Sequence, residues 1–445
     1  MSTSRLRRRT VSVLIKARAA AAGVLALAVC AATGSMSTAR ADVAAGTARP
    51  AAATTAAVSP ARTATRPGAA TLPPLDDWQL AGQHVIYSYG GLTPPSGLLT
   101  RICKGQVAGV IFFGANISSE KQIAGVINQL NAANACPANP VHEPLILETD
   151  QEGGLVRRLP GAPVMSEKQI GASSNPAAAA SAAGTGAGDN LLGVGMNTNA
   201  APIVDFYRQA GDFYDQFQRS YSMDPNTAGT LGADFIAAQQ ATGVAATAKH
   251  FPGLASATAS QNTDAEPVTL WDHLDRIRTL DEQPYRLAIA AGVKLVMLDW
   301  AIYPNIGSRR PAGLSSKMVK GELRNGLGFT GVTETDAIEA GALSGFGSIG
   351  SRSVQAAVAG DDLILAASQH ISEGEDATAA LVTAYRDGTL NQADFQASAA
   401  RIIALASADA RFARRRVCFW FAGRRDCRVH RRVPTRGHSF PADRS

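Results

Sequence analysis

Charged and polar side chains follow several short apolar runs in the middle of this chain. Asp150 comes directly after one run, Lys249 and His250 after another, Asp336 after a third, and Asp205 shortly after a fourth. Carboxylates can act as nucleophiles, acids or bases, while an ammonium and an imidazole add further hydrogen-bonding groups for a polar ligand. Each Asp taken singly could simply cap a following helix. Four such ends in one chain favour a common site.

The segments that must position these residues alternate between short apolar runs and Ala-rich stretches of helical period. The runs, several of them continuous as in strands buried on both faces, are His84–Tyr89, Gly109–Phe113, Leu145–Thr149, Gly195–Ala200, Val244–Ala248, Lys294–Leu298, Gly331–Thr335 and Asp362–Ala366. The helix-like stretches include Lys121–Ala135, Ala177–Leu192, Pro225–Thr242, Leu280–Ala291, Ser316–Asn325 and Val354–Ala359. Charged groups at the carboxyl ends of parallel strands converge on one mouth of a barrel.

This alternation predicts an α/β fold, a (β/α)8 barrel forming a single catalytic domain over residues 75–410. An open doubly wound sheet would show the same alternation. No dinucleotide-binding fingerprint follows any predicted strand, because Gly184, Gly186 and Gly188 fall inside a helical stretch. The barrel is therefore the favoured architecture.

Six segments in order resemble glycoside hydrolase family 3, in particular its single-domain β-N-acetylhexosaminidases. They are Gly109–Asn116, Asp150–Arg158 (which begins Asp-Gln-Glu-Gly-Gly), Asn199–Asp205, Lys249–Gly253 (Lys-His-Phe-Pro-Gly), Tyr303–Pro304 and Gly328–Asp336. The resemblance covers about residues 78–408. The Asp-Gln-Glu-Gly-Gly and Lys-His-Phe-Pro-Gly motifs are specific, and their occurrence in the family's order makes chance unlikely.

The resemblance implies a retaining mechanism in which Asp336 is the nucleophile. An alternative role for Asp336 is to cap the helix that follows it. The resemblance also implies that five residues hold the hydroxyls of a sugar: Asp150, Arg158, Arg219, Lys249 and His250. A buried ion pair that holds the barrel mouth is an alternative role for Asp150 and Lys249, and both roles can hold together.

The family's acid/base is missing from this chain. In the family, the loop after Lys-His-Phe-Pro-Gly carries an Asp-Ser-His whose His transfers the proton, whereas here Ser260, Gln261 and Asn262 occupy that place. The candidates for a replacement acid are Asp264 first and Asp299 second, with Glu266 also in the loop. A loop carboxyl that closes over a substrate is desolvated, which raises its pKa toward a useful value.

Two functions follow from this combination. The first is an active exo-β-glycosidase acting on β-N-acetylglucosaminides of cell-wall or chitin type, with a saccharide as its partner. The second is a catalytically impaired carbohydrate-binding relative that lost its acid/base. Turnover of an activated aryl glycoside separates them.

The ends of the chain differ from its middle in charge. Residues 1–41 hold seven basic and no acidic side chains, and residues 411–445 hold eleven Arg and two Asp. Subtraction from the totals of 42 and 36 leaves 24 basic and 34 acidic side chains for residues 42–410, which argues against a nucleic-acid partner. The prediction is a signal peptide over 1–41 cleaved after Ala41, a disordered linker over 42–74 and a disordered Arg-rich tail over 411–445.

Export and the remaining cysteines complete the prediction. The apolar stretch of the leader is too short for a membrane span, so the protein is expected to be secreted without stable insertion. In an exported domain, Cys103 and Cys136 lie in neighbouring segments and are expected to form a disulfide. Cys418 and Cys427 could pair in the tail. No Cys/His spacing indicates a metal, and no organic cofactor is implied. The sequence does not define the oligomeric state.

Overall fold

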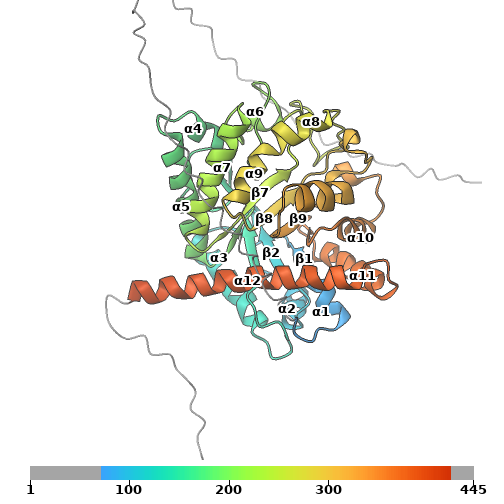
Figure 1. The fold of residues 1–445 in the computed structure, drawn as a ribbon. Helices are drawn as coiled ribbons and strands as arrows, with labels where there is room; N and C mark the ends of the chain where they lie inside the picture. The colour runs from blue at the N-terminus through green and yellow to red at the C-terminus, as the bar shows by residue number, and fades with distance from the viewer. Residues whose placement is uncertain (1–71, 422–445) are drawn as a thin grey trace, which may run out of the picture. The chain divides into compact units, whose positions relative to one another are not determined.

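Eight parallel strands close into a barrel in the part of the chain that the structure describes (Figure 1). The structure is a computed structural model that describes the backbone of residues 72–421 and the side chains of residues 72–407. The order around the barrel is β1-β10-β9-β8-β7-β6-β3-β2. The predicted signal peptide, nearly all of the predicted linker and the end of the predicted tail lie outside the described residues. The predicted barrel fold is confirmed.

The barrel strands are short, and alternate residues face opposite sides. They are β1 (Val85–Tyr87), β2 (Gly109–Phe112), β3 (Ile146–Thr149), β6 (Thr198–Asn199), β7 (Ala245–Phe251), β8 (Leu295–Leu298), β9 (Val332–Ala337) and β10 (Leu363–Leu365). Ile146 and Leu295 belong to one buried apolar cluster inside the barrel, while their neighbours Leu147 and Val296 belong to two other clusters, under the helices. A two-stranded hairpin, β4 (Gln151–Gly153) with β5 (Val156–Arg157), is inserted between β3 and β6. The period of two therefore decides which side chains reach the interior.

Helices surround the barrel on its outer side (Figure 1). The α-helices are α1 (Asp77–Gly82), α2 (Ser96–Cys103), α3 (Glu120–Asn134), α4 (Glu167–Gly171), α5 (Pro176–Val194), α6 (Phe213–Gln216), α7 (Pro225–Gln240), α8 (Leu274–Arg276), α9 (Gln283–Ala290), α10 (Ile349–Ala359), α11 (Ile371–Arg386) and α12 (Gln392–Phe421). Two wider π-helical segments are η2 (Ile277–Asp281) and η5 (Lys317–Gly326). Single 3-10 turns are η1 (Gly114–Asn116), η3 (Pro304–Ile306), η4 (Ala312–Leu314) and η6 (Gly341–Leu343).

The glycines of helix α5 permit close contact with helix α7. A side-chain carbon at Gly184 would lie 2.2 Å from the carbonyl oxygen of Phe235, and one at Gly188 would lie 2.1 Å from the hydroxyl of Thr242. The helix begins with the Asn175 side chain accepting a hydrogen bond from Ala178. These glycines belong to helix packing, which agrees with the absence of a nucleotide-binding fingerprint.

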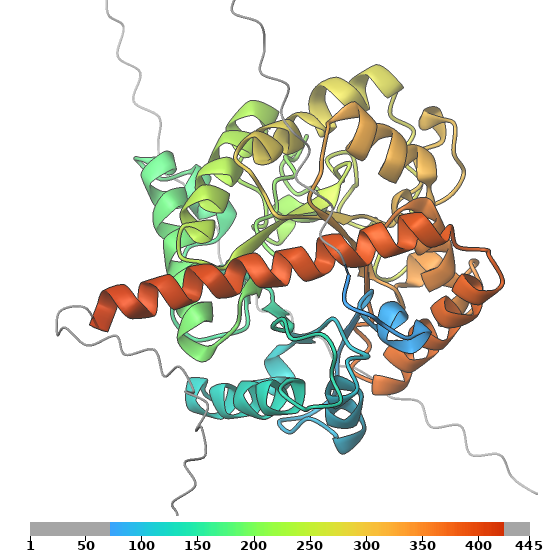
Figure 2. The same cartoon turned by 60° about the horizontal axis from the view of Figure 1, so that its bottom comes forward.

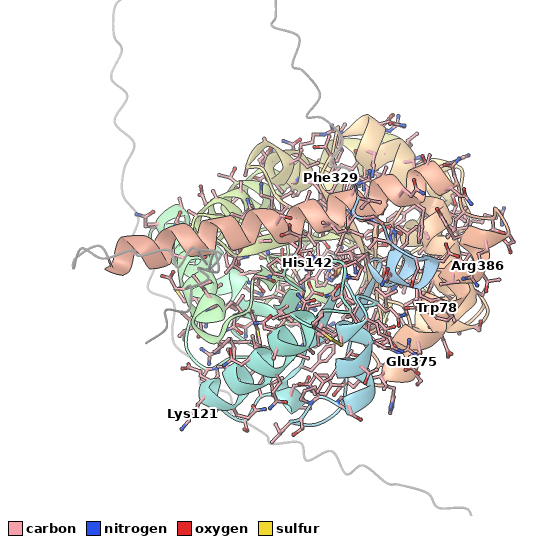
Figure 3. All side chains as sticks on the ribbon, turned by 90° about the horizontal axis from the view of Figure 1, so that it is seen from below. Trp78, Lys121, His142, Phe329, Glu375 and Arg386 are labelled. Carbon is pink, nitrogen blue, oxygen red and sulfur yellow. A yellow bond between two sulfur atoms is a disulfide. The ribbon has the colours of Figure 1, made fainter. Side chains whose placement is uncertain are left out.

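Helix α12 crosses the end of the barrel where the strands begin (Figure 2). Its Ile402 and Leu405 join the apolar cluster inside the barrel. Its Arg401 pairs at 2.6 Å with Asp362, which lies just before β10. Figure 3 shows this face from below with its side chains. The helix therefore covers the bottom of the barrel, and it continues to Phe421, into the segment predicted to be a separate tail.

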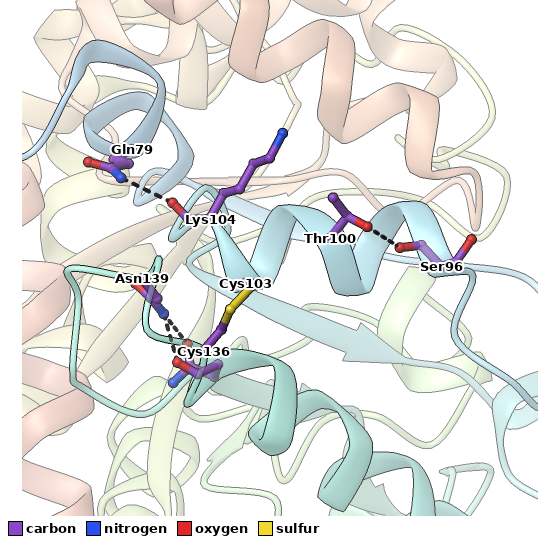
Figure 4. Close-up of a disulfide and its surroundings, with 8 residues drawn as sticks. Gln79, Ser96, Thr100, Cys103, Lys104, Cys136 and Asn139 are labelled. Carbon is purple, nitrogen blue, oxygen red and sulfur yellow. Dashed lines mark hydrogen bonds between the residues drawn. A yellow bond between two sulfur atoms is a disulfide. The ribbon is translucent and has the colours of Figure 1, made fainter.

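A disulfide joins the region of α2 to the end of α3 (Figure 4). Cys103 is the last residue of α2, and Cys136 follows α3. Next to it, the Asn139 amide donates to the side-chain oxygen of Asn134 at 2.8 Å. The bond ties together two outer elements on the side of the barrel that carries β1 and β2. The side chains of Cys418 and Cys427 lie outside the described part of the chain.

Four predicted elements need correction. The strand predicted over Gly331–Thr335 runs on to Ala337, so Asp336 lies within β9 rather than after it. The strand predicted over Val244–Ala248 runs on to Phe251, so Lys249 and His250 lie within β7 rather than after it. The run Gly195–Ala200 contains a strand of only two residues, β6. The stretch Ser316–Asn325 is π-helical rather than α-helical. Polar side chains inside the mouth of a barrel are as compatible with a strand as apolar ones, because they face the cavity.

Replacement of Gly184 tests the α5–α7 packing. Gly184→Ala is expected to destabilise the fold by about 1–3 kcal/mol, because the new methyl group overlaps a backbone atom of α7. In the same helix, a side-chain carbon at Gly193 would meet no atom within 4 Å. Gly193→Ala is therefore the matched control and is expected to be neutral or stabilising by up to about 1 kcal/mol. Equilibrium unfolding in urea measures both. Equal effects of the two variants would contradict the packing argument.

Candidate active site

A cavity of about 350 Å³ opens at the carboxyl ends of the barrel strands. Its charged and imidazole lining residues are Asp150, Arg158, Arg219, Lys249, His250, Asp264, Asp336 and Glu339. Seven of these eight residues were singled out from the sequence. They come from β7, β9 and the loops that follow β3, β6, β7 and β9. The barrel therefore brings together residues that are far apart in sequence.

Lys249 is the centre of an ion-pair network on the cavity wall. Its Nζ lies 2.8 Å from Asp150 Oδ1 and 2.8 Å from Glu152 Oε1. Glu152 also accepts two hydrogen bonds from Arg219, at 2.8 and 2.9 Å. Arg158 donates to Asp150 at 3.3 Å. Three positive charges thus face two negative ones. The structure contains the buried ion pair between Asp150 and Lys249 that was given above as an alternative role for these residues.

The network stays ionised although it is buried. Burial opposes the charge of Asp150, but Lys249 and then Arg158 outweigh it and hold the pKa of this carboxyl well below its usual range. Burial likewise opposes the charge of Lys249, but Asp150 and Glu152 raise its pKa above the usual value. Fixed charges that cannot relax away are suited to hydrogen bonding with sugar hydroxyls. The excess positive charge of the network also favours the ionised form of a carboxyl group nearby.

His250 is held as a neutral imidazole beside the network. Burial, followed by Lys249 and Arg219, lowers its pKa well below the ordinary value. Its Nδ1 lies 2.6 Å from the hydroxyl of Tyr214, and the two rings stack with an interplanar angle of 10°. Arg219 in turn lies over the Tyr214 ring, 5.4 Å from its centroid. A neutral ring can bind a hydroxyl but does not supply an acidic proton near neutral pH.

Asp336 lies in β9 and lines the same cavity. Its Oδ1 accepts a hydrogen bond from the Ala337 amide at 2.7 Å. Burial and then the charge of Asp264 raise the pKa of Asp336 to about 7, while Lys249 acts to lower it. The carboxyl group therefore titrates at a higher pH than an ordinary aspartate does. It shares the cavity with Asp150, Arg158, Arg219, Lys249 and His250.

Two backbone hydrogen bonds join the loop that carries Asp264 to a second loop of the barrel mouth. The Gly341 amide donates to the Asp264 carbonyl at 2.8 Å, and the Ala342 amide donates to the Thr263 carbonyl at 3.1 Å. Both donors lie in the loop that follows β9. A side-chain carbon at Gly341 would lie 2.1 Å from the Ala265 carbonyl oxygen, so only glycine permits this approach. The chain segment after Asp336 thus positions Asp264.

Asp299 and Asp205 are buried away from the cavity lining. Asp299 accepts hydrogen bonds from the Tyr303 hydroxyl and, at 2.8 Å, from the Ala301 amide. Asp205 accepts from the Tyr285 hydroxyl at 2.7 Å and from the His250 amide at 3.3 Å. Neither contacts the cavity. Both tie strand ends to neighbouring loops, so the position of Asp299 does not support a role as acid/base.

Three cavity-region residues were not singled out from the sequence. Glu152 lies within the quoted Asp-Gln-Glu-Gly-Gly motif, and its place in that motif was the available signal. Tyr214 had none, because it lies in the irregular segment around α6. Glu339 accepts a hydrogen bond from the Ala367 amide at 3.3 Å. Burial and the charge of Glu373 raise its pKa to about 8, so it carries a proton at neutral pH.

A metal site is one further possibility for acidic, His and Cys side chains. Among the described residues, no group of three or more His, Cys, Asp or Glu side chains is arranged to hold a metal ion. The side-chain chemistry present in the cavity is that of carboxyl, ammonium, guanidinium and imidazole groups. Carboxyl groups beside fixed charges at the mouth of a barrel are compatible with glycoside cleavage, which uses a pair of carboxyl groups.

Comparison with known proteins gives the family. Residues 96–405 match the glycosyl hydrolase family 3 N-terminal domain. A protein of Arthroderma benhamiae named an uncharacterized secreted glycosyl hydrolase is 46% identical over 328 residues, which are 74% of this chain and 92% of that protein. The chain belongs to glycosyl hydrolase family 3, and it is a glycoside hydrolase.

Solved structures show the same barrel. A family 3 β-N-acetylglucosaminidase from Paenibacillus sp. str. FPU-7 superposes with a TM-score of 0.71 at 33% identity, over 76% of this chain and 63% of that one. A β-N-acetylhexosaminidase from Beutenbergia cavernae superposes with a TM-score of 0.67 at 30% identity, over 75% of this chain and 99% of that one. The resemblance seen in the motifs is thereby confirmed at the level of the family.

The difference in stability between an Asp336→Asn variant and the parent is expected to depend on pH. The pKa of Asp336 is about 7 in the folded protein and 3.8 ordinarily. Between these values the folded state holds a proton that the unfolded state has released, so the stability contributed by this group falls as pH rises. Asn carries no charge at any pH. The variant is therefore expected to exceed the parent in stability at about pH 8 and to lose this advantage at about pH 4.

Urea unfolding of the parent and the variant at both pH values measures the difference. A variant that is no more stable than the parent at the higher pH would contradict the inferred cost of burying the Asp336 charge.

Proposed function

We propose that this protein is a retaining exo-β-glycosidase that removes β-linked N-acetylglucosamine from cell-wall or chitin-type saccharides, with Asp336 as nucleophile. The names of its relatives support the sugar: proteins 31% identical to this chain over 58% of its length, from Stenotrophomonas maltophilia, are named β-hexosaminidase. The two structural neighbours are named β-N-acetylglucosaminidase and β-N-acetylhexosaminidase. The cavity, at about 350 Å³, is near the lower end of the range for ligand pockets, as suits a single sugar ring.

One observation carries the proposal. Asp336 lines the same cavity as the five residues expected to hold sugar hydroxyls: Asp150, Arg158, Arg219, Lys249 and His250. A sugar held by that set would have its anomeric carbon within the same cavity as the Asp336 carboxylate of β9. The alternative role of Asp336 as a helix cap receives no support, because its side chain bonds to the Ala337 amide rather than to a following helix.

The proposed reaction has two steps. In the first, an oxygen of ionised Asp336 bonds to the anomeric carbon while the bond to the leaving-group oxygen breaks and that oxygen receives a proton from an acid. In the second, the conjugate base takes a proton from water, whose oxygen displaces Asp336 and regenerates its carboxylate. Two inversions give net retention. Lys249 favours the ionised form of Asp336 that the first step requires.

Asp264 is the proposed acid/base. It lines the cavity, and its charge acts on Asp336. The side chain is exposed, and a bound saccharide would cover it, which raises the pKa of a carboxyl group. Glu339 is the rival, since it lines the same cavity and already carries a proton at neutral pH. An experiment can separate the two.

Export is proposed for the same protein. The basic head, apolar stretch and Ala39-Arg40-Ala41 site of the leader support secretion, as does the name of the Arthroderma benhamiae relative. None of the described helices is long and apolar enough to cross a membrane. Cell-wall or chitin fragments outside the cell are substrates in keeping with this location.

Replacement of the nucleophile tests the function. The purified protein is expected to release p-nitrophenol from p-nitrophenyl N-acetyl-β-glucosaminide, and the product sugar, followed by NMR, should first appear as the β-anomer. Asp336→Asn is expected to lower kcat by a factor of about 10⁴ or more, because no covalent intermediate can form. Calorimetry with N-acetylglucosamine should show that the variant still binds sugar. Binding by the unaltered protein without any turnover would instead identify the carbohydrate-binding alternative.

Replacement of the acid tests the role of Asp264. Asp264→Asn is expected to lower kcat/KM for a methyl or disaccharide substrate by about 10²–10⁴-fold, and much less for a dinitrophenyl glycoside whose leaving group needs no proton. Azide, which needs no general base, should then restore turnover of the activated substrate and yield the β-glycosyl azide. Glu339→Gln is the matched control and should retain activity on both substrates. The opposite pattern would move the acid/base role to Glu339.

A further inference from the structure

Two glutamates from opposite sides of the strand ring meet inside the barrel, and the reaction proposed above does not use them. Glu148 of β3 and Glu334 of β9 are both fully buried. Their carboxyl groups lie within hydrogen-bonding reach of each other. None of their four oxygens receives a hydrogen bond from any other residue that the structure describes. A pair of buried acceptors without a donor is costly unless the pair supplies its own donor.

Only a proton can join these two groups. Two carboxylates repel each other, whereas a carboxylic acid donates to a carboxylate through a short and strong hydrogen bond. Burial raises the pKa of Glu148 to about 7 and that of Glu334 well above its usual range. Around neutral pH the pair therefore holds a proton that isolated glutamates in water would have released.

The pair lies directly below the candidate active site. Glu148 precedes Asp150 by two residues, and Glu334 precedes Asp336 by two residues. Residues two apart in a strand face the same side at a spacing of about 7 Å. The two sugar-site carboxyl groups thus stand on the same inner face of β3 and β9 as the glutamates.

The surroundings leave few other charges to act on the pair. The charged groups that face it are Lys249 of β7, Asp150 at the end of β3 and Asp336 of β9. The remaining inward-facing residues of the barrel are largely apolar, among them Ile86 and Leu363. Helix α12 covers the bottom with Ile402 and Leu405. All three of these charged groups line the candidate active site above the pair.

We propose that Glu148 and Glu334 share one proton and form a positioning pair that places a single negative charge beneath the site, which sets the pH at which Asp336 ionises. A negative charge about 7 Å away opposes the ionisation of a carboxyl group. Because the pair shares one proton, one negative charge instead of two opposes the ionisation of Asp336. The acid pair thus tunes the nucleophile without touching the substrate. This inference rests on the proposed role of Asp336.

Single and double substitutions separate an effect of the pair's charge from an effect of its structural role. In Glu148→Gln or Glu334→Gln, the new amide can donate to the remaining carboxylate, so one negative charge stays in place. In the double variant Glu148→Gln/Glu334→Gln, that charge is gone. The acidic limb of kcat/KM for an aryl N-acetyl-β-glucosaminide is expected to coincide for the parent and both single variants. It should move down by about one pH unit in the double variant.

Infrared spectroscopy reports on the proton without any need for activity. The spectrum of the parent minus that of either single variant, at neutral pH, should show one carboxylic-acid C=O band. Asp361 serves as the control, since it is buried at the start of β10 with neither oxygen hydrogen-bonded, and burial raises its pKa. Asp361→Asn should also remove such a band while leaving the pH profile unmoved.

Several outcomes would overturn the proposal. These are no carboxylic-acid band in the single-variant difference spectra, an unmoved limb in the double variant, or an equal loss of kcat at every pH in all three variants, as a purely structural role would give. If Asp336→Asn proves fully active, the proposed function fails. The infrared result still decides whether the proton is shared.

Discussion

The burial of one ammonium group organises the mouth of this barrel. Lys249 points inward from β7 and is 2% exposed, and a buried charge of this kind is tolerated only with close partners of opposite sign. Asp150, which follows β3, and Glu152 of β4 supply them, and Arg219 and Arg158 then balance these carboxylates. Removal of Asp150 would take from Arg158 its partner in this network, and removal of Glu152 would do the same to Arg219. The charged residues of this wall are therefore a connected network of ion pairs rather than separate groups.

The same arrangement places opposing demands on Asp336. Burial and Asp264 favour its neutral form, whereas Lys249 favours the carboxylate. The result is a group poised near neutral pH, as is common for residues that take part in chemistry. The position of Asp264 depends in turn on backbone contacts with the loop after β9, so the two carboxyl groups share one structural support. Beneath them the Glu148–Glu334 pair adds a further charge whose size depends on a proton. The site is thus layered along the barrel axis, with apolar packing and helix α12 below.

Much of the fold and part of the site could be predicted from the sequence because they rest on local patterns. Apolar runs of strand length between helical stretches indicated the barrel. The quoted motifs contain five of the eight charged and imidazole residues of the cavity, and Arg219 and Asp264 were singled out outside those motifs. The ends of β7 and β9 were less predictable, because a polar residue that faces a cavity continues a strand without an apolar signal. Glu339 and Tyr214 escaped because nothing near them in the chain marks their approach to the cavity. Asp299 attracted attention for its place after a strand, yet its side chain turns to Tyr303.

The sequence by itself determined which side chains point inward, since the period of two in each strand assigns every second residue to the barrel interior. It also determined the family, through motifs whose order is independent of any contact. Only the tertiary structure decided which inward residues meet. Closure of the barrel brings Glu148 and Glu334 together from distant strands, sets Lys249 between Asp150 and Glu152, and leaves Asp299 outside the cavity. Such contacts depend on the order of the strands around the barrel, and this order is not specified by any single local stretch of the sequence.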